Sequence, residues 1–417
     1  QLSFVVAALA MKCFPVVVCG VVVSIGLQGC GPTPTTTTVT TSTTTVTNTT
    51  TTVTTTVPPW DLYTCNAHFT LNNAQALSRK GICVDDTTFQ QCPDKVPGMW
   101  PNLPGENVAG LRLFKAWRPE WGDEAARKRA WSALTKWVTM NNAKVLIGTE
   151  VTCDKNNDDA AWKLSFELMQ QLGKEHILGV AVGNEMDIYW RGHDAQCIKD
   201  LWNWRYWSDL QSRVADMDKM GFADTRITIV WAMSVLGGDP WKEDGQARVN
   251  TLVKNAYNKW KDRWVWSFNV YSIWDTSMYP TTAQDCDAKS KAAVAISYTQ
   301  NILIVARERI KKTTGGDHNP MWVGENGWSS PMPQGHPLFP FCKEYDSMQT
   351  LQEAYEAFMS WDLSLPRGLT GPEFAFYFTI RDSLNVHAVE HFGLIEKCED
   401  ANCKIYNAKS VAHNNFT

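Results

Sequence analysis

The sequence lacks three patterns that would assign it to large functional classes. Its formal net charge is −4 and its isoelectric point is about 6.1, so it has no basic excess of the kind that nucleic-acid-binding domains carry. It has no Cys-x-x-Cys pair and no Cys/His cluster, which argues against a metal site, and no other cofactor is expected. No strand-like segment precedes a glycine-rich phosphate fingerprint, which weakens the case for an open, doubly wound sheet.

Long apolar runs are also scarce, and the one near the N-terminus has the features of a secretory signal. Met11-Lys12 precedes an apolar stretch, Phe14 to Leu27, of 14 residues, which is short for a membrane span. Small residues follow around Gly29 and Cys30, as at a cleavage site. We therefore expect residues 1–30 to be a signal peptide. If residues 1–10 are translated with it, a signal anchor is the alternative.

A threonine-rich tract separates this segment from the rest of the chain. Residues 33–57 contain 18 Thr and no apolar periodicity, so residues 31–59 are predicted to be a disordered, O-glycosylated linker. Asn48 and Asn415 lie in N-glycosylation sequons. The globular domain is expected at residues 60–417, in a secreted glycoprotein of the extracellular space or cell wall.

Nine cysteines follow the leader, at positions 65, 83, 92, 153, 197, 286, 342, 398 and 403. In an exported chain such cysteines favour disulfides, and the odd number leaves one thiol over. Cys83 with Cys92, and Cys398 with Cys403, are close enough in sequence to close small loops. The pairing itself stays open at this point.

Short apolar runs alternate with amphipathic helical segments from Val108 onward, which predicts parallel βα units. One helix is expected over residues 288–311, and Asp158 or Asp159 can cap the helix that follows residues 144–151. Seven strands are expected, at residues 108–116, 144–151, 177–183, 227–233, 266–272, 321–325 and 374–380. An eighth is needed to close a barrel, and residues 81–84 are the candidate. The favoured fold is an α/β (β/α)8 TIM barrel, with its active site at the carboxyl ends of the strands.

Two of the expected strands end in a glutamate. The first delivers Glu185 in Val-Gly-Asn-Glu, and the second delivers Glu325 in Val-Gly-Glu-Asn-Gly-Trp. A single glutamate after an apolar strand is usually a solvated loop charge. Two of them, both following glycine-containing turns at one rim of a barrel, predict the carboxylate pair of a glycoside hydrolase. Glu150, which ends another strand, is a rival carboxylate that we assign to substrate binding or to structure.

These motifs resemble glycoside hydrolase family 17, the β-1,3-glucanases and β-1,3-glucan glucanosyltransferases of the retaining clan A. Residues 182–185 match the family's acid/base motif in full, whereas Asn326 stands where the nucleophile motif usually has Thr. Weaker matches are Arg112-Leu-Phe, Asn269-Val-Tyr and the segment 390–394. The family's auxiliary Glu and Lys after the eighth strand are not evident, because this chain has Arg381-Asp382 there.

The resemblance implies a role for each matching residue. Glu185 is the expected acid/base and Glu325 the expected nucleophile. Asn184 is implied to bind the sugar 2-hydroxyl and Tyr271 to donate a hydrogen bond to Glu325. Arg112 is expected either to favour the charged form of Glu325 or to serve as a structural ion-pair partner.

The chain contains 20 tryptophans, an unusual number, and some of them suit a cleft that stacks sugar rings. Trp328, Trp274, Trp231 and Trp117 are the candidates, and core packing is the alternative for each. The expected activity is retaining hydrolysis of β-1,3-glucan by a monomer. Transglycosylation in wall remodelling, or carbohydrate binding without catalysis, are the alternatives. Nucleic acid is not an expected partner, and membrane anchoring would depend on the N-terminal segment.

Overall fold

The computed structural model describes residues 71, 73–103, 105–189, 193–331, 339–383, 390–400 and 403–407, and the statements below concern these residues. The predicted leader, the threonine-rich linker, Cys65 and the sequons at Asn48 and Asn415 lie outside them. The chain has two units, residues 1–57 and 58–417, and the fold described here belongs to the second.

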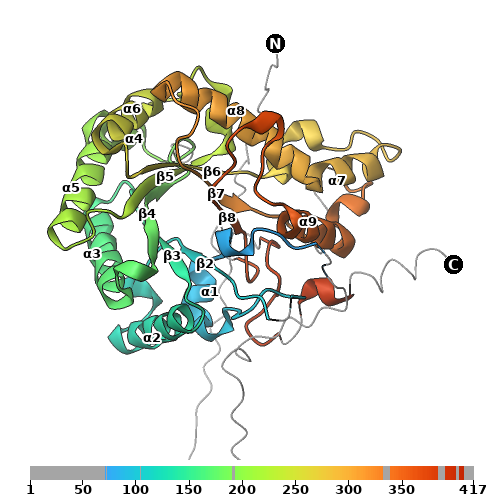
Figure 1. Ribbon diagram of the computed structural model, residues 1–417, viewed down its shortest axis with the longest axis horizontal. Helices are drawn as coiled ribbons and strands as arrows, with labels where there is room; N and C mark the ends of the chain where they lie inside the picture. The colour runs from blue at the N-terminus through green and yellow to red at the C-terminus, as the bar shows by residue number, and fades with distance from the viewer. Residues whose placement is uncertain are drawn as a thin grey trace, which may run out of the picture. The chain divides into compact units, whose positions relative to one another are not determined.

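Eight parallel strands form a closed barrel in the order of the sequence, with β1 paired to β8 (Figure 1). The strands are β1 (Lys80–Val84), β2 (Gly110–Leu113), β3 (Lys144–Thr149), β4 (Ile177–Asn184), β5 (Arg226–Ala232), β6 (Trp264–Asn269), β7 (Met321–Asn326) and β8 (Phe374–Tyr377). The predicted (β/α)8 fold is confirmed. The segment 81–84 supplies the eighth strand, and its Gly81 lies opposite both Gly110 and Phe376.

Helices surround the strands as the alternating pattern predicts (Figure 1). They are α1 (Asp86–Gln91), α2 (Glu124–Met140), α3 (Lys155–Leu172), α4 (Ala195–Asp200), α5 (Tyr206–Lys219), α6 (Val249–Trp260), α7 (Cys286–Val294), α8 (Ile296–Thr314) and α9 (Met348–Ser360). Each long helix buries one apolar stripe; in α2, for example, Trp131, Leu134 and Val138 face inward. Because all strands are parallel, their carboxyl ends meet at one rim of the barrel.

Two helix boundaries differ from the sequence pattern. The residues 288–311 that suggest one helix belong to two, because Ala295 adopts an extended conformation between α7 and α8. Helix α3 is capped by Asp154, whose side chain accepts hydrogen bonds from the amides of residues 156 and 157. Asp158, which the sequence suggests as the cap, is instead buried inside the helix and paired with Arg205.

Three disulfides join Cys92 to Cys398, Cys153 to Cys197, and Cys286 to Cys342. Small loops closed by Cys83–Cys92 and Cys398–Cys403 are therefore wrong, because residues distant in sequence come together when the barrel closes. Cys403 is also disulfide-bonded. Cys83 is the free thiol among the described residues; it is buried in β1, and burial raises its pKa.

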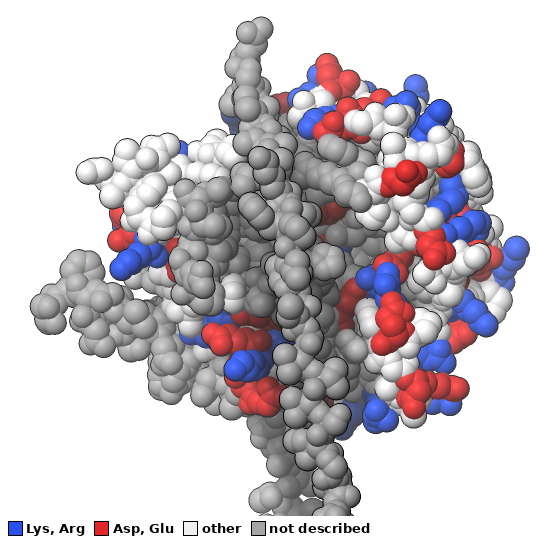
Figure 2. Space-filling view, turned by 180° about the vertical axis from the view of Figure 1, so that it is seen from behind, with Lys and Arg blue, Asp and Glu red and all other residues white. Residues whose placement is uncertain are grey.

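Acidic and basic side chains are interspersed over the coloured part of the face shown in Figure 2. This distribution agrees with the small net charge of −4. None of the helices in the described part of the chain combines the length and the apolar character that a membrane crossing requires.

Candidate active site

The end of β4 turns sharply to present Glu185. Gly183 and Glu185 both have left-handed backbone conformations, with φ of 85° and 51°. A Cβ on Gly183 would lie 2.7 Å from the hydroxyl oxygen of Tyr206, so the position has no room for a side chain. The amide of Glu185 donates a 2.7 Å hydrogen bond to the carbonyl of Val230 on β5, which fixes the turn.

Glu325 lies inside the end of β7 and is 6% exposed. Its Oε1 accepts hydrogen bonds from Arg112 Nη1 and Asn269 Nδ2, both at 2.8 Å. Its Oε2 accepts one from the Tyr271 hydroxyl at 2.5 Å. A guanidinium and two neutral donors thus stabilise a negative charge on this carboxylate.

Asn269 connects the two glutamates. Its Nδ2 also donates to Glu185 Oε1, at 2.9 Å. Two oxygens that lie 2.9 and 2.8 Å from one nitrogen are at most 5.7 Å from each other. The sequence assigned Asn269 only to a weak motif. The available signal was its position at the end of β6, the strand next to β7 on the rim.

Arg112 organises the floor of the site from β2. Its Nη1 contacts Asn269 Oδ1 at 3.1 Å as well as Glu325, and its Nη2 donates to Asn184 Oδ1 at 2.7 Å. The guanidinium lies 4.4 Å from the centroid of the Phe114 ring, a cation–π contact. Arg112 is therefore an ion-pair partner that directly contacts the candidate nucleophile. This geometry is compatible with both roles expected for it, a structural ion pair and an influence on the charge of Glu325.

The environment drives the protonation of Glu185 in one direction. Burial, followed by the charge of Glu325, raises the pKa of Glu185 from 4.5 to about 8, although the Asn269 hydrogen bond opposes the shift. Burial and the charge of Glu325 also raise the pKa of Tyr271 well above its ordinary value, so its hydroxyl stays a donor. The site therefore pairs a protonated Glu185 with a Glu325 that accepts hydrogen bonds on both oxygens.

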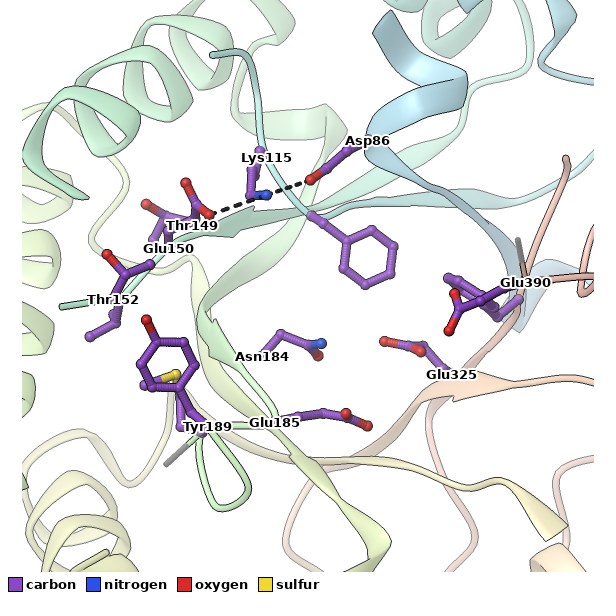
Figure 3. A pocket seen from close by; sticks show the side chains of 14 residues that line it. Asp86, Lys115, Thr149, Glu150, Thr152, Asn184, Glu185, Tyr189, Glu325 and Glu390 are labelled. Atoms are coloured by element: carbon purple, nitrogen blue, oxygen red, sulfur yellow. Dashed lines mark hydrogen bonds and ion pairs between the residues drawn. The ribbon is translucent and has the colours of Figure 1, made fainter. Parts of the chain in front are cut away.

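A cavity of about 310 Å³ opens over these residues, at the small end of the range for ligand pockets. Figure 3 shows Glu185 and Glu325 reaching into it from different strands, with Asn184 beside them. The two predicted glutamates and Asn184 are thus brought together at one mouth. Arg112 and Tyr271 contact one member of the pair, through their hydrogen bonds to Glu325.

The candidate tryptophans are placed differently. Trp328, Trp231 and Trp117 are buried, and none of them lines the cavity. Trp328, for instance, donates from its indole nitrogen to the Tyr345 carbonyl. This placement favours the packing role that was the alternative. Trp274 is 52% exposed and is not among the residues that line the cavity. The centroid of its ring lies 6.2 Å from that of Phe392.

The aromatic side chains that do line the cavity are Phe114, Tyr189 and Phe378. Two of them directly follow strands, Phe114 after β2 and Phe378 after β8, so their places on the rim follow from the barrel. None of the three was predicted, because only tryptophans were considered as stacking surfaces.

Glu390 is a further carboxylate in the cavity lining that the sequence assigned only to a motif. Burial, followed by the negative charges of Glu325 and Asp85, raises the pKa of Glu390 to about 7. Figure 3 shows it on the same side of the cavity as Glu325. Its signal was its position in the segment after β8, which ends on the catalytic rim.

A possible metal-binding group lies elsewhere. Cys286, Cys342 and Glu344 approach closely enough to hold an ion. The two cysteines form a disulfide, however, so they offer no thiolates.

Comparison of the sequence with protein-family profiles and with curated proteins finds no match. Solved structures with a similar architecture exist. A Rhizomucor miehei β-1,3-glucanosyltransferase mutant in complex with laminaritriose is 12% identical, with a TM-score of 0.46, over 79% of this chain and 96% of that one. A plant β-glucan endohydrolase is also 12% identical, with a TM-score of 0.44, over 80% and 95%. A Cellvibrio japonicus xylanase mutant is 10% identical, with a TM-score of 0.44, over 80% and 97%. At such low identities and scores, the likeness says nothing about the substrate of this chain.

Proposed function

We propose that this protein is a retaining β-glycoside hydrolase that cleaves β-1,3-glucan by double displacement. The observation that carries the proposal is the Asn269 amide that touches both Glu185 and Glu325. It keeps their nearest oxygens within 5.7 Å, which suits the separation of about 5–5.5 Å used by retaining enzymes. Inverting enzymes leave room for a water and hold their carboxyl groups about 6.5–9.5 Å apart.

In the first step, Glu325 attacks the anomeric carbon and Glu185 gives its proton to the leaving glycosidic oxygen. The bond to the leaving sugar breaks as an ester forms on Glu325. The raised pKa of Glu185 keeps that proton available at neutral pH. The motif resemblance assigns Asn184 to the sugar 2-hydroxyl. Its Oδ1 accepts a hydrogen bond from Arg112, which holds the side chain beside the two glutamates.

In the second step, Glu185 takes a proton from an incoming hydroxyl, which attacks the anomeric carbon and releases Glu325. Esterification removes the negative charge of Glu325, one of the causes that raise the pKa of Glu185, so Glu185 becomes the base that this step needs. Water as the acceptor gives hydrolysis. A second glucan chain gives transfer, so the two outcomes differ in the acceptor and not in the catalytic pair.

The β-1,3-glucan assignment rests on the motif resemblance around residues 182–185 and 324–328. Secretion to the extracellular space or cell wall is proposed with it. The three disulfides support that location, because such bonds persist in oxidising compartments.

The test is to incubate the purified protein with laminarin and with mixed-linkage, β-1,4- and β-1,6-glucans, and to follow the products by NMR. We expect β-anomeric products from laminarin first, with longer oligosaccharides alongside short ones if sugars also serve as acceptors. Initial α-anomers would overturn the retaining mechanism. Glucan binding without cleavage between pH 4 and 8, unchanged by Glu185→Gln, would establish the non-catalytic alternative.

A further inference from the structure

Three charged side chains from adjacent strands form a wall of the cavity away from the two glutamates. Asp86 follows β1, Lys115 follows β2 and Glu150 follows β3, and all three line the cavity. Because β2 pairs with both β1 and β3, Lys115 lies between the two acids. Its Nζ lies 2.6 Å from Asp86 Oδ2 and 3.1 Å from Glu150 Oε1 (Figure 3).

Each carboxylate of the wall is paired with a cation. Glu150 has a second cation, Arg118, which contacts both of its carboxylate oxygens, one of them from Nε at 2.9 Å. Arg118 also contacts Glu120 at 2.8 Å, outside the cavity lining. The wall therefore offers paired charged groups, which can donate and accept hydrogen bonds, to a ligand in the cavity.

Two polar atoms on this wall have no hydrogen-bond partner within the described part of the chain. They are Asp86 Oδ1 and Thr149 Oγ1, in residues that are 8% and 3% exposed. A buried polar atom left without a partner costs free energy, so its presence calls for an explanation. Lys115 has three ammonium hydrogens and two acceptors, which leaves one more donor on the same wall.

We propose that Asp86, Lys115 and Thr149 form a subsite that binds the hydroxyl groups of a second, neutral sugar, next to the sugar held at Glu185 and Glu325. Neighbouring hydroxyls of a pyranose can each donate and accept, so they match an array of one ammonium, one carboxylate and one hydroxyl. This inference rests on the proposed function. It adds that kcat/KM depends on the chain length of the substrate, through residues outside the catalytic pair.

A purely structural network makes a different prediction. If Lys115 only joined the ends of β1 and β3, its removal would lower thermal stability and affect all substrates equally. Loss of a sugar subsite affects only substrates that are long enough to reach it. Chain-length dependence therefore separates the two roles.

The experiment compares Lys115→Met and Asp86→Asn with the unmodified protein. The substrates are an aryl β-glucoside, which fills one sugar site, and laminaritriose and laminaritetraose. For the oligosaccharides we expect kcat/KM to fall about tenfold or more, mainly through KM, because hydrogen bonds to charged groups are lost. For the aryl glucoside we expect a change of less than about threefold.

Lys128→Met is the matched control, since it removes an ammonium that is paired with Glu124 on the exposed face of α2. Thermal melts establish that each variant is folded, and Asp86→Asn keeps the volume of the side chain if Lys115→Met does not fold. Equal losses on short and long substrates, or none on either, would overturn the subsite.

Failure of the proposed function would look different, because the unmodified protein would then cleave none of the glucans. In that case NMR titration with laminaritetraose still decides the subsite. Binding weakened by Lys115→Met and not by Lys128→Met supports it, and binding that is absent or equal in both variants overturns it.

Discussion

Glu185 and Glu325, 140 residues apart in the sequence, accept hydrogen bonds from the same nitrogen, Nδ2 of Asn269. One neutral donor thus touches two carboxylates that differ in every other contact. Glu325 also accepts hydrogen bonds from Arg112 and Tyr271. Among the described residues, the Asn269 amide is the side-chain donor to Glu185. This asymmetry, together with the raised pKa of Glu185, favours Glu185 as the proton donor of the pair.

The role of each glutamate can be tested with azide. In Glu325→Gly, azide should attack the bound substrate directly and give an α-glycosyl azide from an aryl β-glucoside. In Glu185→Ala, azide should attack the ester on Glu325 and give a β-glycosyl azide. Without azide, loss of the acid/base should lower kcat by about 100- to 10,000-fold on glucan. NMR of the azide products distinguishes the roles, and the opposite anomers would reverse the assignment.

The rate should fall on the alkaline side as Glu185 loses its proton. Because burial and Glu325 raise its pKa to about 8, kcat/KM on laminarin should decline as pH rises through about 8. A pH–rate profile measures this, and Glu185→Gln should lack the alkaline limb in its residual activity. A decline already complete below pH 6 would contradict the assignment of this pKa to the acid.

The same pKa predicts a pH-dependent effect on stability. The folded protein holds the Glu185 proton up to about pH 8, whereas the unfolded chain releases it near the ordinary value of 4.5. Stability from this group is therefore present at low pH and is lost as pH rises from 4.5 through 8. Glu185→Gln should raise the melting temperature by about 2 °C or more at pH 8 and leave it unchanged at pH 4. Calorimetry at both values provides the test, and an equal effect at both would count against the linkage.

Asn269→Ala should lower kcat by about 100-fold, the scale seen when one preorganised donor is removed from a reacting centre. Asn326→Ala is the control, because its amide donates to Val270 and Thr299 instead of the glutamates. That variant should lose stability with little loss of kcat. Kinetic assays and thermal melts measure both losses. If the two variants lost kcat in the same proportion to their fall in melting temperature, Asn269 would have a structural role only.

Gly324→Ala should disturb the site without removing any charged group. A Cβ there would lie 2.5 Å from Val230 Cγ1, 2.8 Å from Asn269 Oδ1 and 3.0 Å from Arg112 Nη1. The methyl group must displace the partners of Glu325, so activity should fall at least tenfold and the protein should be destabilised by about 1–3 kcal/mol. Gly237→Ala is the control, because its Cβ would lie 3.9 Å from the nearest atom. It should change neither the activity nor the melting temperature, as measured by assays and thermal melts.

Much of the barrel could be predicted because its signal is local. Apolar runs such as residues 177–183 and 321–325 alternate with amphipathic helices, and that alternation is enough to predict parallel strands. The two glutamates followed from the same logic, since the ends of parallel strands share one rim. The break between α7 and α8 at Ala295 could not be predicted, because alanine has no local preference for ending a helix.

The order of the strands and the carboxylates at their ends follow from local side-chain periodicity, which neighbouring residues carry. Other features appear only in the folded barrel: Asn269 lies between those carboxylates, Trp328 packs inward while Phe114 lines the cavity, and Cys92 bonds to Cys398. Each of these depends on how the barrel closes and twists, which brings together residues that no local pattern relates.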